Sequence, residues 1–417
     1  MDKMVVVGNG PLHGTVAASG AKNAALPILF STLLAEGEHV FKNIPKLKDI
    51  ESTAELLQSL GCETRWDGDY FRVHVSPLQS YEASYDLVRK MRASFLCMGP
   101  MLAKYGEAVV SQPGGCAIGS RPIDLHLEGF KALGAVITQK EGYVHAAAKK
   151  LKGSTFLFET VTVGGTENVM MAATLADGIT ILENAAKEPE IVDLAEYLNK
   201  MGAKITGHGT SVIRIEGVSK LKPAEHSIMP DRIEAGTLLI AGAITKGQVT
   251  VTKCVPAHLE ALILKMREAG FKIETTKDTM TVFPCEKWEA VDITTAPHPL
   301  FPTDLQAQFM ALMTVANGTS VITETVFENR FMHVTELSRL GSDITPKTRV
   351  AVVRGSPGKL TGAPVMATDL RASASLVLAG LVAEGETIVN RIYHLDRGYE
   401  KLEDKLSSLG AKIRRME

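Results

Sequence analysis

A loop rich in glycine and proline carries the most reactive side chain of the sequence. Residues 112–122 read QPGGCAIGSRP, a composition that neither a helix nor a strand favours but that is typical of a functional loop. Cys116 in such a loop is expected to be accessible, and the nearby Arg121 favours its thiolate form. No second cysteine or histidine stands at ligand spacing from Cys116, so we expect no metal site. We interpret Cys116 as a reactive thiol.

Basic residues recur at the starts of helices that are expected to be buried. Lys22, Arg92 and Arg371 each lie at such a start. A helix N-terminus presents free N–H groups and a partial positive charge, so several starts aimed at one cleft would bind a phosphate or a carboxylate. The alternative is that each residue only caps its helix or pairs at the surface. Their recurrence in phase along the chain favours an anion site.

Three aspartates hold equivalent positions directly before buried helices. Asp231, Asp304 and Asp369 are all suited to cap the helix that follows, and capping alone would explain them. A general base would also have to face a substrate hydroxyl. The spacing leaves both interpretations open and does not say which aspartate would act.

Other familiar catalytic patterns are missing from the sequence. His126, His333 and His394 have no serine or aspartate at the spacing of a hydrolase triad. Neither a Walker loop nor a GxGxxG motif after a strand occurs, which argues against ATP or NAD as a cofactor.

The elements that must position these residues repeat along the chain. One glycine series lies 73, 68, 68, 71 and 69 residues apart: Gly61, Gly134, Gly202, Gly270, Gly341 and Gly410. A second series keeps the same interval upstream: Gly37, Gly106, Gly178, Gly247, Gly318 and Gly385. Two series in phase over the whole length predict six copies of one unit of about 70 residues.

Each unit has the same order of predicted elements. A helix that is apolar on all sides opens it, as in 23–35, 168–176, 238–245 and 373–383, and such a helix is a buried one. A glycine that caps this helix, a β-branched strand such as 248–252 or 319–323, and an amphipathic helix such as 191–201 or 401–409 follow. Alternating strands such as 211–215 and 350–353 close the unit, so we predict six βαβαββ-like repeats.

The length of 417 residues favours two domains of three repeats each. We expect residues 22–229 to form one domain, which contains the cysteine loop. Residues 1–21 and 230–417 should form the other, because the strand around 14–19 is expected to complete the sheet of the sixth repeat. The active site would then lie in the cleft between the domains.

The composition narrows the class of protein. A net charge of −2 without a dense basic run argues against nucleic-acid binding. No apolar stretch approaches the length of a membrane span, and five cysteines point to no disulfide framework. We therefore expect a cytoplasmic protein, and two self-contained domains are compatible with a monomer.

Six stretches of the sequence are long and chemically unusual: SGAKNAALPI (19–28), PGGCAIGSRPID (113–124), FPTDLQAQF (301–309), TVFENRFMH (325–333), ATDLRASASLVLAG (367–380) and YHLDRGYEKLEDKL (393–406). Through them the sequence resembles the UDP-N-acetylglucosamine 1-carboxyvinyltransferase family of enolpyruvyl transferases over essentially its full length. The resemblance implies a two-domain inside-out α/β barrel with three βαβαββ units per domain. It also implies phosphoenolpyruvate and UDP-N-acetylglucosamine as substrates in the first committed step of peptidoglycan synthesis, without a cofactor.

The resemblance implies a role for each matching residue. Cys116 would protonate phosphoenolpyruvate and form a covalent adduct with it, Asp304 would take the proton of the sugar hydroxyl, and Asn23 would touch the sugar. Lys22, Arg121 and Arg397 would hold the phosphate and carboxylate, with Arg92 and Arg371 close by. The remaining matches are the uridine and diphosphate contacts Pro122, Ile123, Asp124, Leu125, Thr162, Val163 and Gly164, the sugar contact Val326, and the supporting residues Arg330 and Asp369.

Three alternatives stay open beside this function. The shikimate-pathway enolpyruvyl transferase shares the fold but uses 3-phosphoshikimate, and the Cys116 loop argues against it. A catalytically silent nucleotide-sugar-binding regulator is disfavoured because Lys22, Cys116, Asp304 and Arg397 are all present. A non-enzymatic repeat scaffold would not gather Lys and Arg at helix starts.

Overall fold

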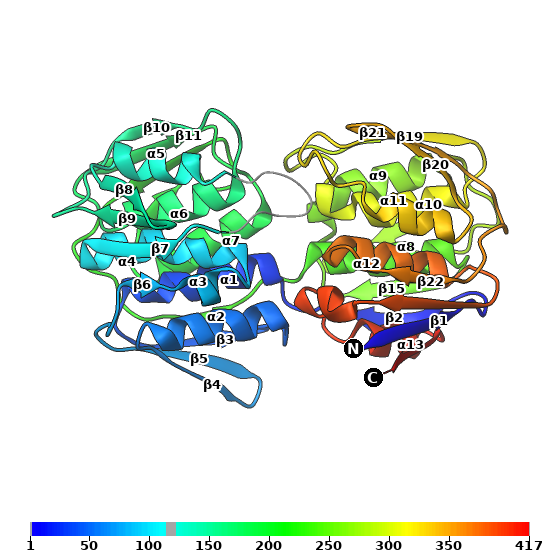
Figure 1. Cartoon of the computed structure of the whole chain (residues 1–417), viewed down its shortest axis with the longest axis horizontal. Helices are drawn as coiled ribbons and strands as arrows, with labels where there is room; N and C mark the ends of the chain where they lie inside the picture. Colours follow the sequence, from blue (N-terminus) through cyan, green and yellow to red (C-terminus); the bar gives the residue numbers. More distant parts are fainter. Residues whose placement is uncertain (1, 114–121, 417) are drawn as a thin grey trace. The chain divides into compact units, whose positions relative to one another are not determined.

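The computed structural model describes residues 2–113 and 122–416, which form two compact units (Figure 1). The N-terminal unit comprises residues 20–113 and 122–229, and the C-terminal unit comprises residues 2–19 and 230–416. The chain passes from one unit to the other after Ser19 and again after Met229. Each unit has its own hydrophobic core.

Six four-stranded sheets, three in each unit, share one pairing pattern over the described residues. In the third repeat β10 (Thr155–Leu157) is parallel to β11 (Ile179–Glu183), which pairs antiparallel with β13 (Val212–Glu216), and β13 pairs antiparallel with β12 (Lys204–Thr206). The predicted βαβαββ order is confirmed. The other strands, sheet by sheet, are β14 (Glu225–Ser227), β3 (Gly37–Lys42), β5 (Tyr70–Val75) and β4 (Glu63–Asp67); β6 (Glu82–Ala83), β7 (Glu107–Ser111), β9 (Tyr143–Ala147) and β8 (Val136–Lys140); β16 (Ile273–Thr275), β17 (Thr279–Val282), β15 (Gln248–Thr252) and β2 (His13–Ala17); β18 (Ile293–Thr294), β19 (Thr319–Thr323), β21 (Val350–Arg354) and β20 (Asp343–Pro346); and β22 (Pro364–Met366), β23 (Glu386–Asn390), β1 (Lys3–Val7) and β24 (Lys412–Met416).

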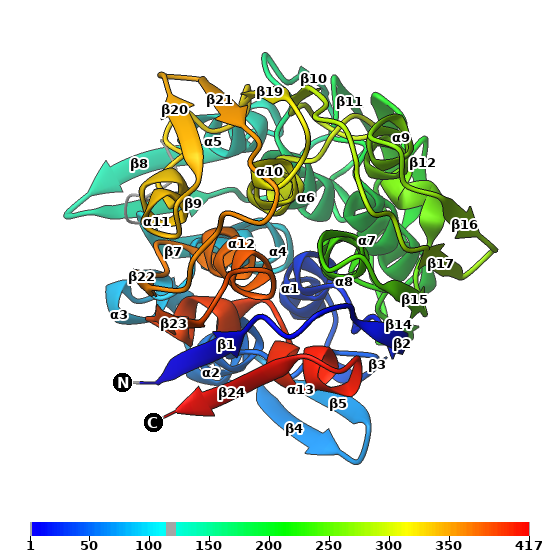
Figure 2. The ribbon, with the colours of Figure 1, turned by 90° about the vertical axis from the view of Figure 1, so that its right-hand side faces the viewer.

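Three helices form the centre of each unit. Those of the C-terminal unit, α8 (Arg232–Ile244), α10 (Gln306–Thr314) and α12 (Leu370–Gly380), pack against one another inside the three sheets (Figure 2). All nine residues of α10 are buried, as expected for a helix that is apolar on every side. The central helices of the N-terminal unit are α1 (Lys22–Ser31), α4 (Met98–Tyr105) and α6 (Val163–Ala173).

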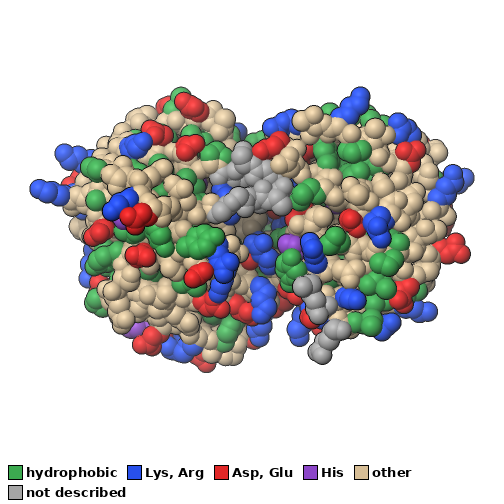
Figure 3. Space-filling model, in the orientation of Figure 1, with side chains coloured by type: hydrophobic (Ala, Val, Ile, Leu, Met, Phe, Trp, Pro, Cys, Tyr) green, Lys and Arg blue, Asp and Glu red, His purple; other side chains and the backbone are tan. Residues whose placement is uncertain are grey.

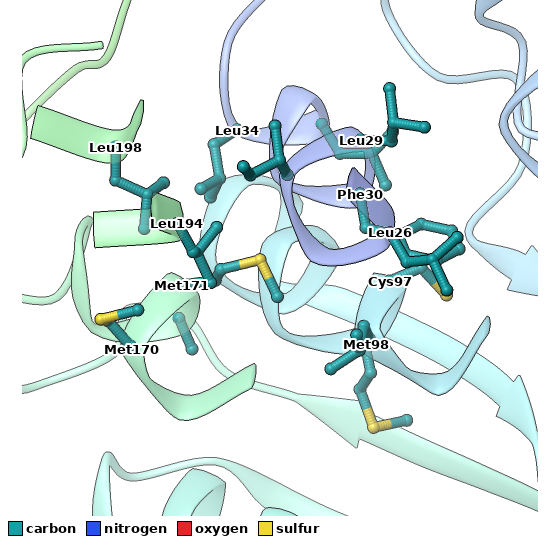
Figure 4. Packing of buried hydrophobic residues seen from close by; sticks show 14 of the residues in the cluster. Leu26, Leu29, Phe30, Leu34, Cys97, Met98, Met170, Met171, Leu194 and Leu198 are labelled. Atoms are coloured by element: carbon teal, nitrogen blue, oxygen red, sulfur yellow. The ribbon is translucent and has the colours of Figure 1, made fainter. Parts of the chain in front are cut away.

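The core of the N-terminal unit is built where these helices meet. Figure 4 shows Phe30 of α1, Met98 of α4 and Met171 of α6 among the packed side chains, together with leucines of α7 (Pro189–Lys200). A Cβ at Gly99 would collide with the carbonyl oxygen of Asn168, so only glycine allows α4 and α6 to approach this closely. Charged side chains of both signs are interspersed on the visible face of each unit (Figure 3).

Two central helices begin at least five residues before the apolar runs that predict them. The run 168–176 predicts α6, but the helix starts at Val163, and the run 238–245 predicts α8, which starts at Arg232. Thr162 and Asp231 are the caps that set these starts, since each side chain accepts a hydrogen bond from the first helical turn. The polar first turns are helical because tertiary packing outweighs the cost of glycine and β-branched residues there.

An amphipathic helix lies outside the centre in each repeat, and a glycine ends it. The glycines of the first series have φ between 90° and 111°, a left-handed conformation that glycine adopts without strain. The second series departs from this rule once: in the fourth repeat Lys246 has the positive φ, and Gly247 is required because a Cβ would collide with the carbonyl oxygen of Leu12. The outer helices besides α7 are α2 (Lys48–Ser59), α5 (Asp124–Ala132), α9 (Glu260–Glu268), α11 (His333–Arg339) and α13 (Leu402–Ser408).

The strand expected to complete the sixth sheet lies elsewhere. Strand β2 runs parallel to β15 in the sheet of the fourth repeat, and β1 completes the sixth sheet between β23 and β24. The prediction for residues 14–19 was therefore wrong. Only β24 follows α13 in the described chain, whereas the outer helix of each other repeat is followed by two strands, so the sixth sheet takes its middle strand from β1.

The first and fourth repeats exchange their leading strands. In the other four repeats, the strand before the central helix pairs with the strand after it. By contrast, β2 precedes α1 but pairs with β15, while β14 precedes α8 but pairs with β3. Just after each exchanged strand, a backbone N–H donates to a carboxylate of the same unit. Glu234 accepts from the Ser19 backbone at 2.5 Å, and Asp193 accepts from the Met229 backbone at 3.2 Å.

This exchange predicts a difference between fragments. A polypeptide of residues 20–229 contains all strands of its three sheets and is expected to unfold cooperatively on heating. A polypeptide of residues 230–417 lacks β1 and β2, so one sheet loses its middle strand, and we expect no cooperative transition. Adding a peptide of residues 2–19 should restore the transition in calorimetry, whereas a peptide with the same composition in scrambled order should not.

Candidate functional site

Asp304 lies where two central helices of the C-terminal unit begin. It sits in η4 (Thr303–Leu305), the single turn that leads into α10. Its Oδ1 is 2.8 Å from Nη1 of Arg330, and its Oδ2 is 2.9 Å from Nη2 of Arg371, the second residue of α12. Both arginine side chains are almost fully buried, while a quarter of the aspartate side chain remains exposed. Asp304 is thus a carboxylate held from both sides, with an exposed edge.

The two arginines decide the charge of this carboxylate. Burial alone would raise the pKa of Asp304, but Arg371 and Arg330 outweigh it and hold that pKa well below its usual range. Burial would likewise lower the pKa of Arg371, yet Asp304, Tyr399 and Asp231 together raise it. Nη1 of Arg371 is buried and has no hydrogen-bond partner among the described residues. The same guanidinium packs against Tyr399, with its Cζ 5.4 Å from the centroid of the ring.

The three equivalent aspartates differ in what they bind. Oδ1 of Asp231 accepts hydrogen bonds from the first turn of α8, and Oδ1 of Asp369 does so at α12, with N–O distances between 2.8 and 3.0 Å. Asp304 makes no such cap and binds the two arginines instead. Capping therefore accounts for two of the three aspartates, and Asp304 is the one whose side chain is used otherwise.

Two other predicted residues of this unit are Val326 and Arg397. Val326 lies after β19, and its backbone N–H donates to Glu324 at 2.8 Å. Arg397 ends η5 (Ile392–Arg397), and it helps to lower the pKa of His394 after the larger effect of burial. Burial also lowers the pKa of His333 to about 4, where Asp369 opposes and Arg330 adds to the effect.

Lys22 is the first residue of α1 and forms a buried ion pair. Its Nζ lies 3.0 Å from Oδ2 of Asp49 on α2, and the two side chains are 11% and 4% exposed. Asp49 was not predicted, because it looks like an ordinary acidic residue in the first turn of an amphipathic helix. The next residue on α1, Asn23, is exposed.

A second cluster joins the starts of three helices around His126. This imidazole lies in the first turn of α5, and its ring packs edge-on against Phe95 with centroids 5.4 Å apart. Its Nδ1 is 3.1 Å from Nδ2 of Asn168, and a Cβ at Gly164 would lie 3.5 Å from its Nε2. Burial first, and then Arg92, lowers the pKa of His126 to about 4, so the ring is neutral and Nε2 carries the proton.

Two further predicted residues, Arg92 and Gly164, lie near His126. Arg92 opens η2 (Arg92–Cys97), the turn before α4, and its charge acts on the same ring. In the sequence, His126 could only be described as a histidine without a triad partner, and nothing there marked it as a neighbour of these residues. Cys116 and Arg121 lie outside the described residues. The other predicted contacts stand at the starts of α5 and α6: Pro122, Ile123, Asp124 and Leu125 on the first, and Thr162, Val163 and Gly164 on the second.

Three carboxylates lie close together in the interior of the N-terminal unit. Burial first, and then the charges of Glu190 and Glu188, raise the pKa of Glu167 on α6 well above its ordinary value. The folded state therefore binds a proton at Glu167 that the unfolded state releases near pH 4.5. The stability from this group is fully present below pH 4.5 and is lost as pH rises through the folded pKa.

The variant Glu167→Gln is expected to remove this pH dependence. The difference in the free energy of unfolding, variant minus wild type, should increase by up to about 1.4 kcal/mol per pH unit from pH 4.5 up to the folded pKa of Glu167. Urea denaturation between pH 5 and 8 measures the difference. Glu159→Gln, at an exposed position of the same unit, is the control and should follow the wild type. A constant difference between Glu167→Gln and wild type across this range would contradict the expectation.

Neither a metal-binding group nor a membrane-spanning helix occurs among the described residues. Among residues 2–113 and 122–416, no group of three or more His, Cys, Asp or Glu side chains could hold a metal ion. In the same part of the chain, each helix is too short or too polar to cross a membrane.

The chain is similar over almost its whole length to enolpyruvyl transferases. Residues 6–406 match the family model of EPSP synthase (3-phosphoshikimate 1-carboxyvinyltransferase). The chain is 91% identical over 414 residues to a UDP-N-acetylglucosamine 1-carboxyvinyltransferase of Bdellovibrio bacteriovorus, which covers 99% of this chain and all of that protein. A Myxococcus xanthus protein of the same name is 60% identical over 418 residues and covers all of this chain and 99% of its own.

Two solved structures share the fold. The enolpyruvyl transferase NikO from Streptomyces tendae superposes with a TM-score of 0.89 at 25% identity and covers all of this chain and 99% of its own. EPSP synthase from Acinetobacter baumannii superposes with a TM-score of 0.75 at 16% identity over the full length of both chains. The predicted two-domain α/β fold with repeated βαβαββ units is confirmed.

Proposed function

The chain belongs to the EPSP synthase family of enolpyruvyl transferases, and on this premise we propose that it transfers the enolpyruvyl group of phosphoenolpyruvate to the 3-hydroxyl of UDP-N-acetylglucosamine. Inorganic phosphate is released, and the product is the first committed intermediate of peptidoglycan synthesis. The observation that carries the proposal is the 91% identity over 414 residues with a protein of that name. A cytoplasmic location follows from the substrates.

The chemistry requires an acid, a base and a place for anionic charge. Protonation of C3 of phosphoenolpyruvate makes C2 electrophilic, the sugar 3-hydroxyl adds to C2, and the tetrahedral adduct then loses phosphate and the C3 proton. Cys116 is proposed as the acid and as the site of the covalent adduct. Lys22, Arg121 and Arg397 would hold the phosphate and carboxylate, and the helix starts add their dipoles. Neither the formation of the tetrahedral adduct nor its breakdown to the product requires a cofactor.

Asp304 is proposed as the base for the sugar hydroxyl. The low pKa that Arg371 and Arg330 impose keeps it ionised at neutral pH, so it is ready to accept a proton. The same low pKa weakens its basicity while both arginines are bound. An incoming carboxylate or phosphate that draws the charge of either arginine away from Asp304 would strengthen it as a base.

The nucleotide sugar is proposed to bind the cluster around His126. Arg92, the start of α5 and the start of α6 supply a cation and free N–H groups for a diphosphate. Asn23 and Val326 would contact the sugar. The proposed residues are divided between the two units, so turnover is expected to require both of them.

The experiment that tests the function is phosphate release from phosphoenolpyruvate with UDP-N-acetylglucosamine or 3-phosphoshikimate as the acceptor, for the wild type and Cys116→Ala. We expect release with the nucleotide sugar alone, and a severe loss in the variant. Release with 3-phosphoshikimate would instead support the shikimate-pathway reaction. Tight binding of the nucleotide sugar without phosphate release would indicate a silent regulator.

A further inference from the structure

Glu324 is a buried carboxylate next to the proposed site that neither the sequence pattern nor the proposed mechanism uses. It follows β19, is 1% exposed and makes no ion pair in the described part of the chain. Its Oε1 accepts from Oγ1 of Thr295 at 2.8 Å and from the backbone N–H groups of Val326 at 2.8 Å and Phe327 at 3.1 Å. Its Oε2 accepts from Oγ1 of Thr303 at 2.9 Å. Four donors thus surround one buried acceptor.

The bond to Thr303 continues towards Asp304. A hydroxyl donates one hydrogen bond and accepts others, and Thr303 donates to Glu324 because a carboxylate can only accept. Its oxygen is therefore free to accept from Nη1 of Arg330, at 2.9 Å. The same Nη1 lies 2.8 Å from Oδ1 of Asp304. The order Glu324, Thr303, Arg330, Asp304 is a chain of hydrogen bonds whose direction the carboxylate of Glu324 sets.

Glu324 also fixes a second contact of Arg330. The backbone that it holds at Phe327 carries an aromatic ring, and the Arg330 guanidinium lies 5.3 Å from the centroid of that ring. The backbone of Val326, a proposed sugar contact, is held by the same oxygen. The carboxylate of Glu324 therefore orients the Thr303 hydroxyl and the Phe327 ring, which both contact Arg330. It also holds the backbone of Val326.

We propose that Glu324 is a positioning residue of the transfer reaction, which holds Arg330 against Asp304 through Thr303 and so keeps Asp304 aimed at the sugar hydroxyl. This inference rests on the proposed function, since it gives Asp304 the role of base. Displacement of a catalytic group by about 1 Å can cost about 10²-fold in rate, so a residue that acts through two hydrogen bonds can still matter.

The charges around Asp304 make this role measurable by pH. Arg330 lowers the pKa of Asp304, so a displaced Arg330 should let that pKa rise, although Arg371 still lowers it. The acidic limb of kcat/KM should then move to higher pH. The other titratable groups that face these arginines are Asp231 and Tyr399 near Arg371, and His333 near Arg330, where Asp369 acts on His333 in turn.

Two variants test the chain of hydrogen bonds from different ends. In E324Q the side chain keeps its size, but an amide N–H₂ that faces Thr303 donates, so the hydroxyl loses its acceptor and turns its proton towards Arg330. T303V removes the hydroxyl altogether. We expect kcat to fall about 10- to 100-fold in both, with KM for UDP-N-acetylglucosamine within about twofold of the wild type, and the acidic limb to shift upward. The double variant should be no slower than E324Q alone, because both break one chain.

T295V is the matched control. Thr295 donates to the same carboxylate at 2.8 Å, but its side chain has no hydrogen bond to Arg330. T295V should lower the melting temperature about as much as T303V and leave kcat and the acidic limb unchanged. Equal shifts of the limb in T295V and T303V would overturn the proposal in favour of a purely structural role.

The activity of the wild type distinguishes a failure of the proposed function from a failure of the proposed role of Glu324. A wild type that releases no phosphate with the nucleotide sugar refutes the proposed function itself. If the wild type is active and T303V keeps its kcat and acidic limb, the role of Glu324 is refuted while the function stands. Because T303V removes only a hydroxyl, it serves as the decisive variant should E324Q fail to fold.

Discussion

Asp304→Asn is expected to lower kcat by about 10²- to 10⁴-fold, the range that a general base contributes. The amide cannot accept the proton of the sugar hydroxyl, and its N–H₂ group would face one of two buried guanidinium groups. It leaves the charges of Arg330 and Arg371 without their counter-ion, so we also expect the free energy of unfolding to fall by about 3 kcal/mol. Phosphate release and urea denaturation measure the two effects.

Asp343→Asn is the control for this substitution. Asp343 lies in the same unit and bonds Arg354 at 3.0 Å, but both side chains are about half exposed. An exposed pair contributes little, so we expect a stability change below about 0.5 kcal/mol and unchanged turnover. Wild-type kcat in a folded Asp304→Asn variant would remove Asp304 from the proposed mechanism.

Lys22→Met is expected to lower kcat/KM for phosphoenolpyruvate by about 10²- to 10³-fold, as the loss of one strong donor to developing charge does. The substitution keeps most of the volume of the side chain but removes the ammonium group at the start of α1. It also leaves Asp49, which is 4% exposed, without the partner 3.0 Å away. A loss of stability is therefore expected together with the loss of activity.

The double variant Lys22→Met/Asp49→Asn separates these two effects. It removes both charges of the buried pair, so stability should recover towards that of the wild type while activity stays low. Lys131→Met is the control, because Lys131 and Glu128 form an exposed pair at 2.8 Å in the same unit. Recovery of activity in the double variant would show that Lys22 serves only to neutralise Asp49.

Local patterns in the sequence were enough to predict most of the fold. The β-branched runs 248–252 and 319–323 coincide with β15 and β19, since alternation and side-chain shape mark a strand over its whole length. The first turns of α6 and α8 were missed, because polar and glycine residues hide a helical turn whose stability comes from packing. The exchange of β2 and β14 could not be predicted: each strand is compatible with either partner, and long-range pairing decides between them.

Residues of the site were predictable where their own type shows their chemistry. Asp304, Arg330 and Arg371 were predicted, and both arginines lie within hydrogen-bond distance of Asp304. Which of the three equivalent aspartates escapes capping depends on side chains far along the chain. Asp49, His126 and Glu324 were missed for the same reason, since each is an ordinary residue until tertiary contacts place it.

The exchanged strands set an order in which the protein can fold during its synthesis. All strands of the N-terminal unit are made between β3 and β14, so that unit can fold while the ribosome still adds the rest of the chain. Strand β1 is made before them, but its partners β23 and β24 come last. Strand β1 therefore presents an unpaired apolar edge, Met4–Val6, until the end of elongation, whereas β2 can pair once β15 has been made, and chaperones or rapid translation would protect the β1 edge from aggregation.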